Sequence, residues 1–460
     1  MPTPDRMQLA AEVSPVTVLV RGVLEWMFPD ESLEALYAQA PRCWTRALTI
    51  QSLFWLVVDV VSGARDAVFA AYQADQALAE PTIPVSFQAV YDKLGRMPSE
   101  FGSSLVRASA ERLQPLLAQA NPRHFKGLKA YRVIVIDGTD LGGTEHRLAV
   151  LRRIKAAGLP GRLVVAYDWS TGICLDATAS EDAYTSERVL VSGILQRAQP
   201  GEVFVMDRYY STTPVMQAIR ARRAHFVIRE DARNVRCESR GRKKYLGRTA
   251  TGRVYERTLE VEDTQTRERF DVRHLILVLD QPTEEGDTEV RLLTNLPAAV
   301  SGLRIMELYR ERWTLERHFA LLKNCLHGEI ESLGKPAAAL FMMCLALVAG
   351  NALAVVKQAI RTTHGEKEME RLSSHYLADE LEKNYQAVDI LIRVAEWRKL
   401  QQLSARTFWT WTIQIAKRIR TRAFHKHPRG PKRPRPKRAT GRNRHHYSTY
   451  RLLNPDEKKP

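Results

Sequence analysis

The segment between residues 131 and 229 alternates short apolar runs with amphipathic stretches, and this alternation constrains the fold more than any other feature of the chain. Runs rich in β-branched and aromatic residues favour strands. These runs are "YRVIVID" (131–137), "RLVVAYDWSTGICLDATAS" (162–180, two strands with a turn at 168–172), "EVFVMD" (202–207) and "HFVIR" (225–229). Helical spacing lies between them, at 185–198 and 211–223. The order of strand, hairpin, helix, strand, helix and strand predicts an α/β layer with a mixed sheet.

The two flanks of this layer have other patterns. Up to about residue 120 the apolar residues recur at helical spacing, which predicts a helical bundle. Residues 230–289 combine a basic loop, "SRGRKKYLGR" (239–248), with alternating apolar and polar positions, which predicts a β-rich insertion. Helical patterns resume after residue 356 and continue to about residue 419.

One apolar run, "AAALFMMCLALVAGNALAVV" (337–356), has the length of a membrane span. It is rich in alanine, contains Asn351 and stands alone in a strongly basic chain. A buried helix is therefore the favoured interpretation, because apolar runs of this kind also form the cores of soluble domains. We expect no membrane association.

The charge of the chain is concentrated at one end. The formal net charge is +17, and residues 397–455 contain 17 Lys and Arg and no Asp or Glu. Such an excess favours a polyanionic partner, nucleic acid first and an anionic membrane surface second. The stretch from Lys417 to Arg444 alone has 13 basic residues. It is interpreted either as a DNA-binding arm or as a solubilising end, and DNA binding is favoured.

The five cysteines are scattered and form no CxxC pair or zinc-type spacing, which suits a reducing compartment. The first residues, "MPTPDRMQLAAEVSP", lack the pattern of a signal peptide. We therefore expect a cytoplasmic protein.

Two aspartates, Asp137 and Asp207, end apolar runs of the predicted sheet. The carboxyl ends of strands in open α/β sheets line the crevice in which ligands bind. Each aspartate alone is weak evidence, since Asp is also a common turn residue. Asp140, three residues after Asp137, is a rival for the first position.

A third carboxylate lies in "LYRERWTLERHFALLKNCL" (308–326), which predicts one amphipathic helix. At about 100° per residue, Tyr309, Arg312, Glu316 and Lys323 fall on one edge of that helix, beside its apolar stripe. The alternative is a solvated edge with an Arg312–Glu316 pair, worth about 0.3 kcal/mol. If the three carboxylates converge, they suit Mg²⁺, and two such ions serve phosphodiester chemistry.

The spacing Tyr309, Arg312, Glu316, Lys323 matches the YREK signature of the insertion-sequence-four family of DDE transposases. Three further segments resemble that family: "VIVIDGTDL" around Asp137, "VFVMDRYYS" around Asp207, and "RLLTNLP" (291–297) before the Glu316 helix. The resemblance covers residues 131–331. One departure is Tyr209, where many relatives have glycine.

The resemblance implies a ribonuclease-H-like core with Asp137, Asp207 and Glu316 as catalytic residues and ligands of two Mg²⁺ ions, with Mn²⁺ as a substitute. The residues implied or expected to bind DNA are Tyr309, Arg312, Lys323, Arg208, Arg240, Arg242, Lys243 and Lys244. The implied reaction is cleavage at the ends of a transposon followed by strand transfer into target DNA. The implied partners are the terminal inverted repeats, target DNA and a second copy of the chain in a homodimeric DNA complex, in a bacterial cytoplasm at the nucleoid.

The expected regions follow the changes in pattern. They are a helical N-terminal region with a DNA-binding role (1–125), the first part of the catalytic core (126–229), the β-rich insertion (230–289), the second part of the core with the Glu316 helix (290–330), a C-terminal helical region (331–419) and a basic tail (420–460). Two other functions remain open, namely a nuclease on the same core without strand transfer and a non-catalytic DNA-binding regulator. If the insertion holds a flipped base, Tyr245 or Tyr255 must do so, because the insertion contains no tryptophan.

Overall fold

A nine-stranded sheet forms the centre of the described chain, in the strand order β3-β2-β1-β4-β5-β9-β8-β7-β6. The computed structural model describes residues 5–41, 47–120, 122–145, 148–153, 158–263, 266–283, 286–427 and 430. The strands are β1 (Arg132–Asp140), β2 (Arg162–Asp168), β3 (Cys174–Ser180), β4 (Glu202–Met206), β5 (His225–Arg229), β6 (Arg236–Thr249), β7 (Gly252–Glu262), β8 (Arg269–Leu279) and β9 (Glu289–Thr294).

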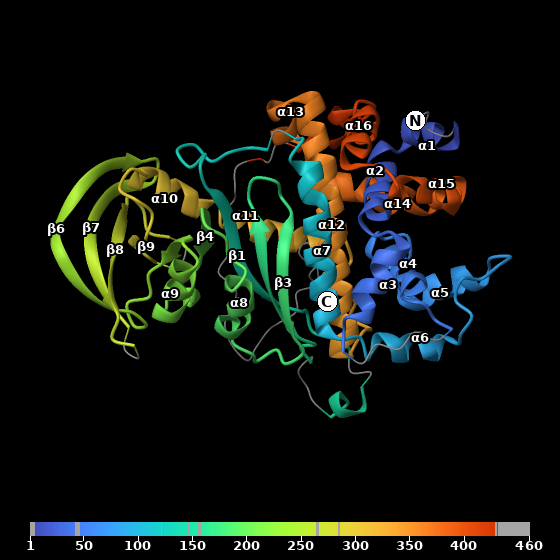
Figure 1. Ribbon diagram of the computed structural model, residues 1–460, viewed down its shortest axis with the longest axis horizontal. Coiled ribbons are helices and arrows are strands. Elements are labelled where there is room, and N and C mark those ends of the chain that lie inside the picture. Colours follow the sequence, from blue (N-terminus) through green and yellow to red (C-terminus); the bar gives the residue numbers. More distant parts are fainter. Residues whose placement is uncertain are drawn as a thin grey trace, which may run out of the picture. The chain divides into compact units, whose positions relative to one another are not determined.

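The sheet is mixed, as expected. Strands β1, β4 and β5 run parallel to one another, whereas β1 to β3 form an antiparallel meander. Strand β9 joins β5 antiparallel and leads through β8 and β7 to β6 (Figure 1). The predicted α/β class is therefore confirmed, with a mixed-sheet core, a β-rich insertion and helical flanks.

Helices cover both faces of the core sheet. Side chains alternate between the two faces of a strand. On one face of β1, Val133 and Val135 belong to the same hydrophobic cluster as residues of two long helices. On the other face, Ile134 and Ile136 belong to a second cluster with residues of two shorter helices. The first pair of helices is α11 (Trp313–Cys325) and α12 (Pro336–His364); the second is α8 (Glu187–Leu195) and α9 (Thr213–Ala221).

Helix α12 contains the apolar run that could have been a membrane span. It is the one helix of the described residues that is long and apolar enough for this, and its apolar window is 100% buried. Asn351 in its middle accepts a hydrogen bond from Cys174 N (2.6 Å) and donates to Cys174 O (2.9 Å) and Ser109 Oγ (2.8 Å). The expected buried helix is confirmed, and its one amide ties it to β3 and to the N-terminal helices.

The helical flanks surround α12 (Figure 1). The N-terminal helices are α1 (Asp5–Val13), α2 (Pro15–Met27), α3 (Asp30–Ala38), α4 (Ile50–Val61), α5 (Val68–Gln76), α6 (Phe87–Leu94) and α7 (Ser99–Leu117). The C-terminal ones are α13 (Glu366–Arg371), α14 (Ser374–Leu391), α15 (Val394–Gln401) and α16 (Ala405–Ala416), followed by the 3-10 helix η3 (Thr421–Phe424). The remaining elements are η1 (Ala149–Leu151), η2 (Arg208–Tyr210) and α10 (Gly302–Arg310).

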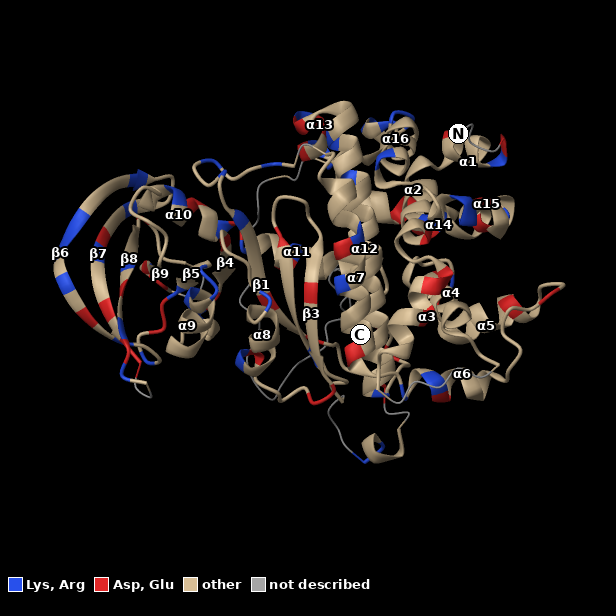
Figure 2. Ribbon diagram, in the orientation of Figure 1, with Lys and Arg blue, Asp and Glu red and all other residues tan. Residues whose placement is uncertain are grey.

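The basic stretch 239–248, expected as a loop, is part of strand β6, so that expectation was wrong. Strand β6 pairs with β7 over most of its length, with irregularities between Arg240 and Lys244 and between Tyr245 and Gly247. Gly247, with a φ of 138°, takes up a backbone conformation that other residues rarely adopt. As an edge strand rich in Lys and Arg (Figure 2), β6 presents positive charge where another strand could otherwise pair.

The described residues up to His425 form one compact unit. The predicted division into six regions stays a prediction. The part of the basic tail beyond residue 430 lies outside the described residues, and so do positions 428 and 429.

Candidate active site

Asp137 and Asp207 lie at the same edge of the sheet. Strands β1 and β4 are parallel, their pairing ends at Val135 and Val205, and Asp137 and Asp207 each lie two residues further along. Asp207 directly follows β4 and caps η2, because its Oδ1 accepts a hydrogen bond from Tyr209 N at 2.9 Å. Asp207 follows the end of β4 as predicted, whereas Asp137 lies inside β1, which continues to Asp140 because residues 137–140 still pair with β2.

The predicted single helix over 308–326 is wrong, since the chain forms two helices. Helix α10 ends at Arg310 and α11 begins at Trp313. Arg312 N bonds to Tyr309 O (3.2 Å), and Leu315 N bonds to Arg312 O (3.1 Å), which is the tighter i to i+3 pattern. The break gives α11 its own N-terminus, where its dipole favours the carboxylate of Glu316 in the first turn.

Arg312 joins the third carboxylate to the first. Its Nη1 lies 2.8 Å from Asp137 Oδ2, and its Nη2 lies 2.6 Å from Glu316 Oε1. The Arg312 side chain is only 13% exposed, and its buried Nε has no hydrogen-bond partner. One guanidinium therefore bridges two of the three predicted metal ligands, in a setting with little water to screen the charges.

The arrangement does not form a closed metal site. Within the described ranges, no group of three or more His, Cys, Asp or Glu side chains could hold a metal ion. The oxygen donors themselves suit a hard ion such as Mg²⁺. The role of Asp137, Asp207 and Glu316 as metal ligands stays a prediction, and in this structure the Arg312 guanidinium contacts both Asp137 and Glu316.

Burial shapes the electrostatics of Asp137. Removal from water raises the pKa of its carboxyl to about 7; Arg312 lowers it, and the neighbouring Asp207 and Glu316 raise it. Such a carboxylate needs a nearby cation to remain fully charged at neutral pH. In this structure Arg312 opposes the rise, but the pKa of Asp137 is about 7 even with that cation in place.

Tyr309 lies beside the same guanidinium. Burial raises the pKa of its phenol to about 12, with Arg312 and Arg229 acting in the opposite direction and Asp207 adding to the rise. Tyr309 is therefore a neutral hydrogen-bonding group at physiological pH. The structure brings Tyr309 and Arg312 to the edge that carries Asp137.

Lys323, in the last turn of α11, lies at the end of β1. Its Nζ donates to Asp140 O at 2.9 Å and pairs with Glu329 at 2.7 Å. The Asp140 carboxylate, the rival for the first ligand position, is held by Arg162 through contacts of 2.6 Å from Nε and 3.1 Å from Nη2. Of the two aspartates on β1, Asp137 is thus the one that contacts Arg312.

With this geometry in place, residues 128–350 match the family described as "Transposase DDE domain". This segment, just under half of the chain, is similar to a transposase DDE domain. The matched residues include β1, β4, α10, α11 and the first half of α12. They therefore include Asp137, Asp207 and Glu316 and also Tyr309, Arg312 and Lys323. The match supports a broad link to DNA transposition.

Two other comparisons add little. A search of curated proteins finds no match. Among solved structures, the chain resembles the piggyBac transposase in a synaptic complex with hairpin DNA, with a TM-score of 0.38 and 8% identity over 89% of this chain and 85% of that chain. At this level the likeness carries no argument about the site.

Basic residues predicted to bind DNA lie at two other places of the matched segment. Arg208, directly after Asp207, lies 3.7 Å from Asp287. Arg240, Arg242, Lys243 and Lys244 lie on β6, which β5, β9, β8 and β7 separate from β4. Arg240 pairs with Glu260, and Lys243 lies over the Tyr255 ring at 4.3 Å. The structure does not bring these β6 residues to the carboxylates.

Sequence reasoning missed a fourth carboxylate in the matched segment. Glu187 begins α8 and accepts a hydrogen bond from the Tyr210 hydroxyl at 2.7 Å. Burial raises the pKa of its carboxyl; Tyr210 and Arg162 lower it, and Asp207 raises it. The only local signal was Ser186, a helix-capping residue directly before Glu187. That signal predicts a helix start but not a neighbour 23 residues away.

Proposed function

We propose that this protein is a DNA transposase that cleaves the ends of its own element and joins them to target DNA. The observation that supports this most is the Arg312 bridge between Asp137 and Glu316 inside the segment that is similar to a transposase DDE domain. A guanidinium that binds carboxylates in the free protein presents the same planar fork to a phosphate.

DNA binding would use the edge around Arg312 first. Arg312 and Tyr309 would hydrogen-bond non-bridging phosphate oxygens next to the scissile bond, and Lys323 would add a point charge at the end of β1. Arg208 and the basic residues of β6 would hold neighbouring duplex through sequence-independent charge contacts. Once a phosphate takes Arg312, the carboxylates of Asp137 and Glu316 lose their cationic partner.

Asp137, Asp207 and Glu316 would then hold divalent metal ions, two Mg²⁺ or Mn²⁺ in the proposal. Bound there, such ions would activate the attacking oxygen and stabilise the leaving oxygen of the phosphodiester. The residues of the chain supply the negative charge for the ions and the positive charge for the DNA backbone. The pKa of about 7 for Asp137 means that its deprotonation accompanies this exchange near neutral pH.

The family, the DNA partners and the oligomeric state are proposed from the YREK spacing of Tyr309, Arg312, Glu316 and Lys323. The protein would belong to the insertion-sequence-four family, recognise terminal inverted repeats, and act as a homodimer on two DNA ends in a bacterial cytoplasm at the nucleoid. A cut-and-paste route through a DNA hairpin is the proposed pathway.

The test is a cleavage assay with Mg²⁺ on DNA that carries the sequences flanking the coding region. Glu316→Ala should abolish cleavage, whereas Glu307→Ala, a carboxylate of α10 that pairs with Arg304, should leave cleavage near the wild-type level. Full activity of Glu316→Ala would refute the proposed role of Glu316.

Two alternatives predict other products. A nuclease on the same core would cut the ends but give no joined strand-transfer product. A non-catalytic regulator would bind DNA without metal and cut it under no condition. Joined products that depend on Glu316 would exclude both.

A further inference from the structure

The first turn of α8 contacts both strand ends that carry the aspartates. The Glu187 carboxylate accepts a hydrogen bond from the hydroxyl of Tyr210, which is completely buried. Tyr210 is the last residue of η2, the short helix that Asp207 caps. A hydrogen bond of 2.7 Å therefore ties the turn after Asp207 to the start of α8.

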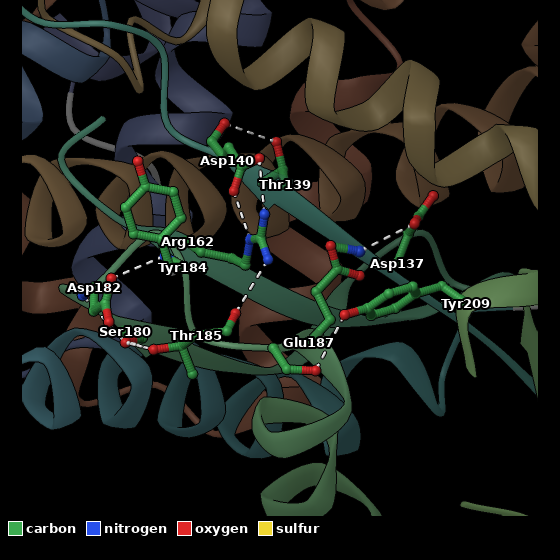
Figure 3. Close-up of polar contacts among 12 residues, drawn as sticks. Asp137, Thr139, Asp140, Arg162, Ser180, Asp182, Tyr184, Thr185, Glu187 and Tyr209 are labelled. Atoms are coloured by element: carbon green, nitrogen blue, oxygen red, sulfur yellow. Dashed lines mark hydrogen bonds and ion pairs between the residues drawn. The ribbon is translucent and has the colours of Figure 1, made fainter. Parts of the chain in front are cut away.

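The same carboxylate rests on β1. Gly138 follows Asp137, and its N–H donates to Asp137 Oδ1 at 3.0 Å. A Cβ atom added to Gly138 would lie 2.5 Å from Glu187 Oε1, a distance that real side chains do not reach. Glu187 thus fills the space that only a glycine leaves open, directly beside Asp137. Figure 3 shows the Glu187 carboxylate between Asp137 and the Asp140–Arg162 pair.

Two more contacts hold the turn after β4 against α8. Arg188 Nε donates to Tyr209 O at 2.6 Å, and the hydroxyls of Ser186 and Tyr209 lie 3.1 Å apart. Ser186, which caps α8, and the first two residues of α8 therefore contact two consecutive residues of η2. Both elements are short, so these cross-contacts, rather than helical hydrogen bonds, fix the backbone that follows Asp207.

We propose that Glu187 is a positioning residue, which, through Tyr210 on one side and Gly138 on the other, sets the separation of Asp137 and Asp207. This inference rests on the proposed function, because only that function requires Asp137 and Asp207 to bind metal ions together. Active-site groups must be held within a fraction of an ångström, and a displacement of about 1 Å can lower a rate roughly a hundredfold. The carboxylate acts by shape and by accepting a hydrogen bond, and it needs no contact with DNA.

The closing experiment compares Glu187→Ala, Glu187→Gln and Tyr210→Phe in the full-length chain. Controls are Glu181→Ala and Tyr184→Phe, from the exposed loop just before α8. The first readout is Mn²⁺-dependent nicking of a plasmid that carries the flanking DNA. Glu187→Ala and Tyr210→Phe should slow nicking by roughly tenfold to a hundredfold, with unchanged DNA affinity. Glu187→Gln should keep most of the rate, since its amide oxygen can still accept from Tyr210.

A second readout does not depend on activity. Hydrogen exchange in a peptide covering residues 207–212 should be faster in Glu187→Ala and Tyr210→Phe than in Glu187→Gln or the controls. Unchanged exchange and nicking in Glu187→Ala would overturn the positioning role. A Glu187→Gln variant as slow as Glu187→Ala would also overturn it, because the charge would then be required. If the wild-type chain cuts no DNA, the proposed function fails, and the exchange data decide the structural part separately.

Discussion

Arg312 and Asp137 are 175 positions apart in the sequence, yet Arg312 Nη1 lies 2.8 Å from Asp137 Oδ2. This ion pair is largely buried, with side-chain exposures of 13% and 15%. It links the turn between α10 and α11 to the middle strand of the core. Because breaking a buried pair leaves an uncompensated charge, any ligand that takes one partner must also supply a substitute for the other.

The first prediction is that Arg312 competes with divalent metal for the carboxylates. Arg312→Gln should bind Mn²⁺ at least about tenfold more tightly than the wild type in the absence of DNA, a difference of about 1.4 kcal/mol. The measurement is a Mn²⁺ titration followed by electron paramagnetic resonance. Arg310→Gln, an exposed neighbour, is the control and should match the wild type. Equal affinities in Arg312→Gln and the wild type would show that the guanidinium does not block the site.

The second prediction concerns the charge on β6. Arg242, Lys243 and Lys244 lie on this exposed edge strand, and replacing all three with alanine should weaken binding to any duplex. The slope of log affinity against log salt should fall by up to about 0.9 for each lost phosphate contact. Fluorescence anisotropy at several salt concentrations measures it. Arg248→Ala, on the same strand but paired with Asp280 at 2.6 Å, is the control with the smaller expected effect.

If the salt slope of the triple variant equals that of the wild type, β6 does not contact DNA. The positive charge of β6 would then serve only to keep an edge strand from pairing with another chain.

The strands of the core were predictable because their signals are local. The buried parts of β1 (133–136) and β4 (202–206) are runs of mostly apolar residues, so they appear as continuous apolar segments that are followed by Asp. Asp137 and Asp207 follow from the same runs. Which of Asp137 and Asp140 faces Glu316 did not follow, since the answer depends on Arg312 and Arg162, which come from distant segments.

Other features were decided by tertiary contacts. The basic stretch in β6 has low strand propensity, with two glycines and five Lys or Arg between 239 and 248, and only its pairing with β7 makes it a strand. The break before α11 carries neither Gly nor Pro, so no local signal marks it. The DNA-binding role expected for residues 1–125 stays a prediction, and their charge gives it no support, with 13 Asp and Glu against 10 Lys and Arg.

The third prediction is a stability test of the contact between Gly138 and Glu187. Gly138→Ala should destabilise the fold by about 1 kcal/mol, because the Glu187 carboxylate must move away from the new methyl group and loses its hydrogen bond from Tyr210. Combining it with Glu187→Ala should recover most of that loss, since the obstacle is removed. Urea unfolding of the wild type, both single variants and the double variant measures the coupling. Additive effects would mean that the two residues do not press on one another in solution.

The fourth prediction concerns Asp59 of α4, at the junction of the N-terminal and C-terminal helices. Burial raises the pKa of its carboxyl to about 7; Asp389 adds to the rise, and Arg21 opposes it. In the unfolded chain the pKa is about 3.9. The folded state thus holds the proton more tightly, so this contribution to stability is complete below about pH 4 and is lost as the pH rises through 7.

Asp59→Asn should prevent the fall in the free energy of unfolding that ionisation of Asp59 causes above pH 7, because the amide stays neutral at every pH. The variant should therefore be more stable than the wild type at pH 8, by at least about 1 kcal/mol given about 1.4 kcal/mol per pKa unit. The advantage should shrink as the pH falls toward 4, where the wild-type carboxyl is itself protonated. Comparing the two proteins at each pH cancels other titrating groups, such as Glu380, whose pKa burial also raises to about 7. A difference that does not vary between pH 5 and pH 8 would mean that Asp59 remains ionised in the fold, held by Arg21.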